Sequence, residues 1–341
     1  MPNARQWRQR CPDYIKIQRD ASGKYVSFNT TDSVLSNYKT AISNVASYIN
    51  YDASLAKGLK LVAALRYDIY HYNFQNYLTP SAVSGAPSTI NNFSRFSPKI
   101  GLTYNYKSIG FYGNYSEGYV PPQVGELFNS VKVPYLQPQS FFNYEIGGWL
   151  SLLNNKIYID YSLYLLNGTN EIISVRQTDG SYQNQNSGQT KHKGIEYGVT
   201  YKPTSEWLLR FSGTNAIHCF VKDIEKGIDY SGHEIANAPH FIANAELMYK
   251  PTWAKGLRIG VEWQHMSHYF MDNANTVKYS GFDVFNVRTG YAIKHFEVWV
   301  NTLNVLNKYY AVIASKSSYG YTYNIGDPRE ITLGVSFKFG K

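Results

Sequence analysis

The chain has 341 residues, of which 17% are charged and 16% are aromatic, and its formal net charge is +9. Low charge with many aromatic residues excludes a disordered chain, and no apolar run reaches the ~18 residues of a membrane helix. The basic residues are scattered, so we interpret the charge as a solvated surface and expect no nucleic-acid partner. A transmembrane β-barrel is not excluded, because only every second residue of its strands meets lipid.

Residues 1–43 have no pattern that assigns them to a domain, apart from one strand expected near 24–28. The first 18 residues hold several charges but no apolar core of the kind that a secretory signal needs, so none is predicted. The two cysteines, Cys11 and Cys219, have no metal-binding spacing, and two free thiols or one bridge are equally open.

From residue 44 onward the dominant pattern is an alternation of apolar and polar residues. In the segment 156–167, Ile159 and Leu163 fall on one face, whereas Asp160 and Ser162 fall on the other. Such alternation predicts strands with one apolar and one polar face. Together with the strand near 24–28 there are about 14, and almost no helix is expected. The other predicted strands are 44–53, 58–70, 95–106, 109–118, 140–152, 156–167, 191–202, 206–219, 240–251, 257–269, 281–292, 296–304 and 330–339.

The predicted connections alternate strictly between short turns and long loops. Outer-membrane barrels have this asymmetry, with short periplasmic turns and long extracellular loops. A soluble β-sandwich would also alternate, but it would not need all its long loops at one end. The predicted fold is therefore all-β, an antiparallel transmembrane β-barrel, with a further hairpin expected around 171–176. The long loops are expected at 71–94, 119–139, 168–190, 220–239, 270–280 and 305–329.

Six segments, in order along the chain, resemble the barrel of TonB-dependent outer-membrane receptors. Each one alone is weak, since aromatic alternation recurs in any barrel, but together they cover roughly residues 95–339. They are 97–104 (SPKIGLTY), 112–128 (YGNYSEGYVPP, then GELF), 143–147 (NYEIG), 193–196 (KGIE), 301–310 (NTLNVLNKYY) and 326–329 (GDPR) with the strand that follows.

The resemblance implies that residues 44–341 are the C-terminal part of a receptor barrel, incomplete relative to the 22 strands of the family. No segment resembles the plug domain, through which TonB would act, so the plug is expected to be absent. The resemblance further implies the outer membrane of a Gram-negative bacterium, with lipid and lipopolysaccharide as partners. The implied function is uptake of a scarce nutrient, and an iron–siderophore complex is the favoured ligand.

Three other functions stay open at this point: a passive porin-like channel, an outer-membrane β-barrel enzyme and a soluble binding module. The sequence has no nucleophile elbow, phosphate loop or zinc-protease motif, so no catalytic residue, cofactor or metal site is predicted. His265 and His268 are the closest histidine pair, but an offset of three places them on opposite faces of a strand.

Aromatic residues have a structural and a functional interpretation. Tyr and Trp form girdles at membrane interfaces, and Trp149, Trp207, Trp253 and Trp263 fit such girdles. Loop aromatics and basic residues could instead contact an extracellular ligand such as an anionic ferric chelate. The candidate ligand-binding residues are Tyr119, Tyr135, Arg176, Tyr182 and Tyr269.

Overall fold

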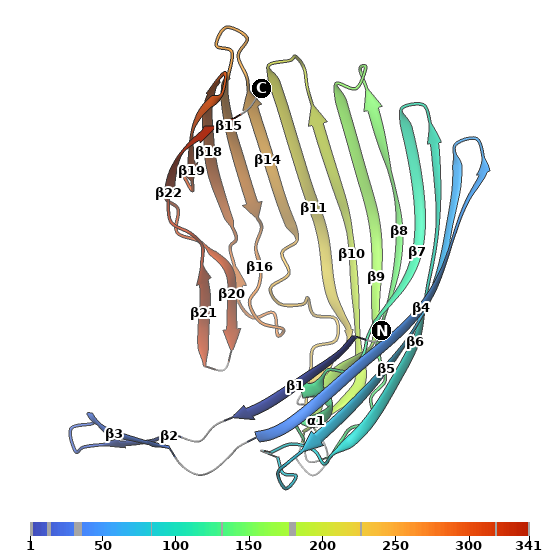
Figure 1. Cartoon of the computed structure of the whole chain (residues 1–341), viewed down its shortest axis with the longest axis vertical. Coiled ribbons are helices and arrows are strands. Elements are labelled where there is room, and N and C mark those ends of the chain that lie inside the picture. The colour runs from blue at the N-terminus through green and yellow to red at the C-terminus, as the bar shows by residue number, and fades with distance from the viewer. Residues whose placement is uncertain are drawn as a thin grey trace.

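The computed structural model describes residues 3–11, 15–30, 36–82, 84–130, 132–176, 182–225, 227–317 and 319–339. One antiparallel sheet of 14 strands dominates it, and each strand pairs with its neighbours in the order of the chain. The sheet curves into an open half-cylinder (Figure 1). Its strands are β1 (Asn3–Cys11), β4 (Ser36–Ala56), β5 (Leu59–Asn76), β6 (Thr89–Tyr106), β7 (Ile109–Val120), β8 (Gln139–Leu152), β9 (Ile157–Arg176), β10 (Tyr182–Tyr201), β11 (Trp207–Lys222), β14 (Phe241–Tyr249), β15 (Leu257–Met266), β18 (Phe282–Ile293), β19 (Phe296–Leu303) and β22 (Glu330–Phe337).

Small elements decorate this sheet. The hairpin of β2 and β3 projects away from it (Figure 1), and the other hairpins lie in the long loops. Helix α1 (Val124–Phe128) has five residues, and no helix in the described part of the chain is long and apolar enough to cross a membrane. The hairpins are β2 (Ile15–Arg19) with β3 (Tyr25–Thr30), β12 (Ile224–Glu225) with β13 (Ile228–Asp229), β16 (Tyr269–Phe270) with β17 (Lys278–Tyr279), and β20 (Ala311–Ser317) with β21 (Gly320–Ile325).

The thirteen strands predicted between residues 44 and 341 all belong to the sheet, and the strand predicted near 24–28 is present but lies outside the sheet. The segment near 24–28 is β3, which pairs only with β2 outside the sheet. The fourteenth strand is β1, which pairs with the first part of β4. The sequence NARQWRQRC of β1 gives no apolar alternation, so its strand character arises from pairing. The sheet therefore begins before the predicted boundary at residue 44.

The six short turns gather at one end of the sheet and the long connections at the other, as predicted (Figure 1). Gly58 sits in the first short turn with φ +81°, and a Cβ there would lie 2.2 Å from the backbone oxygen of Asn105 near the end of β6. Only glycine fits that close approach. Strands β4, β9 and β10 have 21, 20 and 20 residues, about twice the ~9–11 that span a bilayer.

The extra length of these strands lies at the long-loop end. There the predicted hairpin around 171–176 is confirmed, because the last residue of β9, Arg176, pairs with the first residue of β10, Tyr182. The predicted loops are correspondingly shorter than expected, since strand pairing continues beyond the segments that alternate most clearly.

The register separates the two faces of the sheet. One face, called the polar face below, carries Glu145, Asp160, Glu196 and Glu262 on β8, β9, β10 and β15. An open cavity of ≈ 750 Å³ extends along this face from β7 to β18, so the polar face is the concave one. The opposite, convex face exposes large apolar side chains, among them Ile146, Leu163, Ile195, Leu247 and Val261. A soluble sandwich would pack such a face inward.

The sheet is not closed. Strand β1 pairs only with β4, and β22 pairs only with β19, so one edge of each is unpaired within the described sheet. The fold is therefore a 14-stranded antiparallel fragment of a β-barrel.

Aromatic rings cover glycines on directly paired strands at several places. A Cβ at Gly110 would lie 2.1 Å from the ring of its partner Trp149, and Gly334 is covered by Trp299 in the same way. Glycine leaves the space that the ring needs, and the ring compensates for the missing side chain. Trp149 thus lies on the polar face, so its assignment to an outer girdle is wrong. The other covered pairs are Tyr112 with Gly147, Tyr164 with Gly194 and Tyr197 with Gly213.

We predict that Gly110→Val destabilises the folded chain by about 2 kcal/mol, because the new side chain displaces the Trp149 ring. The matched control is Gly118→Val on the same strand, where a Cβ would meet nothing within 4 Å. The measurement is the temperature at which the heat-modifiable migration of the chain on a gel is lost. Equal midpoints for the two variants would contradict the prediction.

Candidate ligand-binding site

The loop 121–138 is fixed at the long-loop end by an aromatic cluster. Phe128 of α1 stacks on Phe74 of β5, with ring centroids 4.2 Å apart, and Leu127 is fully buried beside it. Glu126 caps the helix, since its carboxylate accepts the backbone N–H of Gln123 at 2.7 Å. The loop is therefore packed against the sheet and does not extend freely into solvent.

Tyr135 is displayed on this fixed loop and is 89% exposed. Its neighbour Leu136 is buried, and Gln137 is held on both sides by Asn186 of β10. The Gln137 N–H donates to Asn186 Oδ1 at 2.7 Å, and Asn186 Nδ2 donates to Gln137 O at 2.9 Å. Tyr135 borders a groove of ≈ 360 Å³ that is also lined by Asn92 and Gln137. A rigidly presented, exposed aromatic ring is suited to ligand contact.

Tyr119 lies at the end of β7, with its ring edge-on to Tyr70 at 6.2 Å. Beside it is the carboxylate of Asp68, a residue that is 1% exposed. Asp68 accepts two hydrogen bonds from Arg66 at 2.6 and 2.7 Å and one from Asn44 at 3.2 Å. The positive charge of Arg66 compensates the negative charge of Asp68, and such charge-assisted hydrogen bonds are strong. The fixed carboxylate therefore holds Tyr119 in place near the long-loop end of the sheet.

Arg176 and Tyr182 pair in register at the tip of the β9–β10 hairpin. Their side chains lie outside the described part of the structure, so only their backbone position is established. The structure brings the backbones of these two candidates together.

Tyr269 is buried and does not lie at the surface. It is 2% exposed, and its hydroxyl accepts the backbone N–H of Ala314 at 2.7 Å. Its ring packs against Tyr279 at 5.4 Å, in a cluster with Met271. Tyr269 therefore joins the loops that carry β16–β17 and β20–β21, and its side chain is buried between them.

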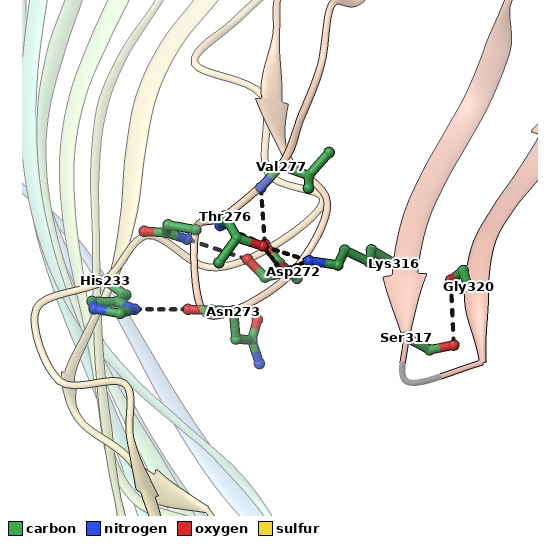
Figure 2. Close-up of polar contacts among 9 residues, drawn as sticks. His233, Asp272, Asn273, Thr276, Val277, Lys316, Ser317 and Gly320 are labelled. Carbon is green, nitrogen blue, oxygen red and sulfur yellow. Dashed lines mark hydrogen bonds and ion pairs between the residues drawn. The ribbon is translucent and has the colours of Figure 1, made fainter.

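Three long loops meet at Asp272, in a contact called the loop junction below (Figure 2). Lys316 Nζ reaches Asp272 Oδ2 at 3.2 Å and Thr276 Oγ1 at 2.7 Å. The neighbouring Asn273 O accepts a hydrogen bond from His233 Nδ1 at 2.9 Å. Burial would raise the pKa of Asp272, but hydrogen bonds from Thr276 and Lys316 outweigh it and lower that pKa. The carboxylate therefore stays charged and joins its own loop to the loop of Lys316, while the backbone of Asn273 joins the loop of His233.

Asp223, at the base of the β12–β13 hairpin, is in the opposite situation. The residue is 3% exposed, and its Oδ1 has no hydrogen-bond partner among the described residues. Burial, followed by the charges of Glu225, Glu171 and Asp229, raises the pKa of Asp223 to about 6. The folded loop is therefore less stable at neutral pH than in acid, because the buried carboxyl of Asp223 is then ionised.

Charge differs between the concave wall and the loops. Glu145, Asp160 and Glu196 line the cavity on the polar face, where Glu145 Oε1 accepts the Tyr112 hydroxyl at 2.6 Å. These three carboxylates make their part of the wall acidic, whereas Arg210 and Arg288 balance Glu246 and Glu262 elsewhere on the same face. The loops above the wall carry exposed aromatic rings and lysines. The arrangement can therefore capture a ligand at the long-loop end. Across the described residues, no three His, Cys, Asp or Glu side chains converge on a possible metal site.

A curved antiparallel sheet with an apolar convex face, a polar concave face and all long loops at one end defines a transmembrane β-barrel of the receptor type. The chain belongs to the family described as TonB dependent receptor-like, beta-barrel, whose sequence model matches residues 4–307.

Solved structures with the same fold include the siderophore receptor PiuA from Acinetobacter baumannii (18% identity, TM-score 0.74, covering 94% of this chain and 50% of that one). BauA, the ferric preacinetobactin receptor from the same organism, matches with 19% identity and a TM-score of 0.73 (93% and 45%). The ferric-catecholate import receptor Fiu from E. coli K12 in its closed form matches with 18% identity and a TM-score of 0.72 (92% and 47%). At these identities the likeness shows the fold alone, and the chain spans about half the length of these receptors.

We predict that Lys316→Met opens the loop junction, because Asp272 then loses its cation while it stays half-enclosed. A hydrogen bond to a charged group contributes about 1.5–3 kcal/mol, so amide hydrogen exchange in 267–281 should accelerate about tenfold. The control is Lys294→Met in the exposed turn between β18 and β19, at the opposite end of the sheet. Unchanged exchange in Lys316→Met would show that the junction does not depend on this ion pair.

The pH dependence of the β12–β13 hairpin follows from Asp223. Its pKa is raised from 3.8 to about 6 on folding, so between these values the folded hairpin keeps a proton that the unfolded one has lost. Stability therefore falls as the pH rises through this window. We predict that Asp223→Asn stabilises the hairpin by about 2 kcal/mol at pH 8 and has little effect at pH 4, measured by hydrogen exchange of the segment 223–232.

The control for this prediction is Asp229→Asn. The exposed carboxylate of Asp229 accepts the Ser231 N–H at 2.9 Å, and hydrogen bonds from Ser231 lower its pKa. Removing that charge should stabilise the hairpin much less than Asp223→Asn does at pH 8, because it relieves only the smallest of the effects that raise the pKa of Asp223. A hairpin that exchanges equally fast in the wild type and in Asp223→Asn at pH 8 is incompatible with a buried, ionised Asp223.

Proposed function

We propose that this chain is the C-terminal barrel part of a receptor in the outer membrane of a Gram-negative bacterium, and that the receptor takes up a ferric siderophore. The observation that carries the proposal is the family match over residues 4–307 on a sheet whose convex face is apolar and exposed. The solved receptors with this fold include one named for a siderophore, one for ferric catecholates and one for ferric preacinetobactin. The matched family is one of receptors, so the proposed activity is uptake and not catalysis.

Ligand capture is proposed at the long-loop end, through Tyr119 and Tyr135. Tyr135 is exposed on a rigid loop, and Tyr119 is held by a compensated network. Arg176 and Tyr182 stay candidates because they share the tip of one hairpin. An aromatic ring favours the flat rings of a catecholate, and loop cations favour the negative charge of a ferric chelate.

Two further partners are part of the proposal. Lys191 and Lys193 are exposed on the convex face towards the long-loop end of β10, where they suit the phosphates of lipopolysaccharide above an apolar band that meets lipid. TonB would supply energy through a plug domain seated against the polar face. This chain on its own is therefore expected to bind ligand without TonB-dependent uptake.

The test measures binding of ⁵⁵Fe-loaded catecholate, hydroxamate and citrate chelates to the full chain in detergent, in competition with haem, cobalamin and maltodextrin. We expect one ferric chelate class to bind. Tyr135→Ala should weaken this binding about fivefold, since an aromatic contact contributes ~1 kcal/mol. The matched control is Tyr309→Ala, because Tyr309 is 91% exposed on a different loop.

The outcomes separate the alternatives. Binding of haem, cobalamin or maltodextrin in place of ferric chelates would overturn the siderophore proposal while keeping the receptor. Binding of no ligand, together with solute-selective conductance in a planar bilayer, would favour a passive channel instead.

A further inference from the structure

Two histidines face each other across β10 and β11 at the long-loop end of the polar face. His192 and His218 are directly paired in the register, and their Nδ1 atoms are 2.7 Å apart. The ring centroids are 5.0 Å apart with an interplanar angle of 55°. Both side chains are half-buried. Other histidines nearby have different partners: His233 meets Asn273, His240 meets Glu234 and His265 meets Asp283.

The surroundings of His192 fix which of its nitrogens carries a proton. Its Nε2 lies 3.0 Å from Thr190 Oγ1. The Thr190 hydroxyl in turn donates to Oε1 of Glu171, so the threonine oxygen is free to accept the His192 Nε2–H. In a neutral imidazole this leaves a lone pair on Nδ1. A histidine oriented through its second nitrogen in this way is typical of metal sites.

A glycine provides the space for the hydrogen-bonded chain of Glu171 and Thr190 that leads to His192. Thr190 is buried, and its directly paired residue on β9 is Gly168. A Cβ on Gly168 would lie 1.9 Å from Glu171 Oε1 and 2.5 Å from Thr190 Oγ1. Any larger residue at this position would displace the carboxylate. The Glu171–Thr190–His192 chain is therefore built into the packing of β9 and β10.

We infer that His192 and His218 form a binding site for a tetragonal divalent metal ion, Cu²⁺ with Ni²⁺ as the weaker choice, on the concave wall of the barrel. Two nitrogens at ~2.0–2.1 Å from a metal are about 2.9 Å apart at a right angle and about 3.3 Å apart at a tetrahedral angle. Without metal the separation is 2.7 Å, the length of a hydrogen bond, and the two Nδ1 atoms move apart by a smaller step to reach the right angle, which Cu²⁺ and Ni²⁺ prefer and Zn²⁺ does not.

Metal binding requires a shift of one proton and a rotation of both rings, because the two Nδ1 atoms face each other along a hydrogen bond. Without metal, the His218 Nδ1–H donates to the His192 Nδ1 lone pair. With metal, His218 loses that proton from Nδ1 and takes one up at Nε2, so the ring stays neutral and both Nδ1 lone pairs bind the ion. No third His, Cys, Asp or Glu of the described chain completes the set, so water or the donors of a bound chelate fill the other positions. The site does not depend on the siderophore proposal.

The experiment titrates Cu²⁺, Ni²⁺ and Zn²⁺ into the full chain, without a histidine tag, in detergent. We expect one equivalent of Cu²⁺ to bind, with an electron paramagnetic resonance spectrum split by two nitrogens, and Zn²⁺ to bind at least tenfold more weakly. His192→Gln and His218→Gln should each weaken Cu²⁺ binding at least tenfold. Thr190→Val should weaken it several-fold while the two-nitrogen signature persists, because it removes only the orienting hydroxyl.

The controls are His71→Gln and His295→Gln. His71 is hydrogen-bonded to Asn92 across β5 and β6, and His295 lies in the exposed turn between β18 and β19, at the short-turn end of the sheet. Neither change should affect Cu²⁺ binding. If the variants fail to fold, copper-catalysed oxidation of the wild type should modify His192 and His218 first. Equal Cu²⁺ binding by the wild type and His192→Gln, or oxidation spread over all histidines, would overturn the inference and leave the pair a cross-strand hydrogen bond.

Discussion

The structure depends on hydrogen bonding between strands that are neighbours in the chain. In hydrocarbon, no water can satisfy a backbone N–H or C=O group, so each strand must be paired along its length. Here every sheet strand pairs with its neighbours in chain order, which makes each contact local and each register dependent on one turn. Because side chains alternate across a strand, the same register decides which residues face lipid and which face the lumen.

The two unpaired edges follow from the same constraint. Strands β1 and β22 each leave one row of backbone groups without a partner within the described sheet, and such edges are unstable in a membrane. The solved receptors of this fold are about twice as long as this chain. Further strands from the rest of a receptor would satisfy these edges, which is consistent with the proposal that the chain is one part of a larger barrel.

The structural contacts differ between the two ends of the barrel axis. The short-turn end is simple, whereas the long-loop end is held by an aromatic cluster around Phe128, by the loop junction at Asp272 and by the cluster around Tyr269. These contacts make the loops a preorganised surface, and preorganisation lowers the entropy that a ligand must overcome on binding. The acidic part of the wall below them and the histidine pair between them have different chemistry, so capture of a chelate and binding of a bare metal ion can be tested independently.

The sequence by itself determined the thirteen alternating strands, the one-sided distribution of loops and the family resemblance, because period-two hydrophobicity and turn length are local properties. It did not reveal β1, whose polar residues give no alternation and whose strand character comes from pairing with β4. It also could not show that Tyr269 is buried or that Trp149 covers Gly110, since both depend on contacts between distant segments. The pairing of His192 with His218 is symmetric about Ser205, whereas the predicted strand ends at 202 and 206 are symmetric about Thr204 and would pair His192 with residue 216. Only the tertiary structure fixes the turn, and with it the pair, because register is decided by packing across the whole sheet.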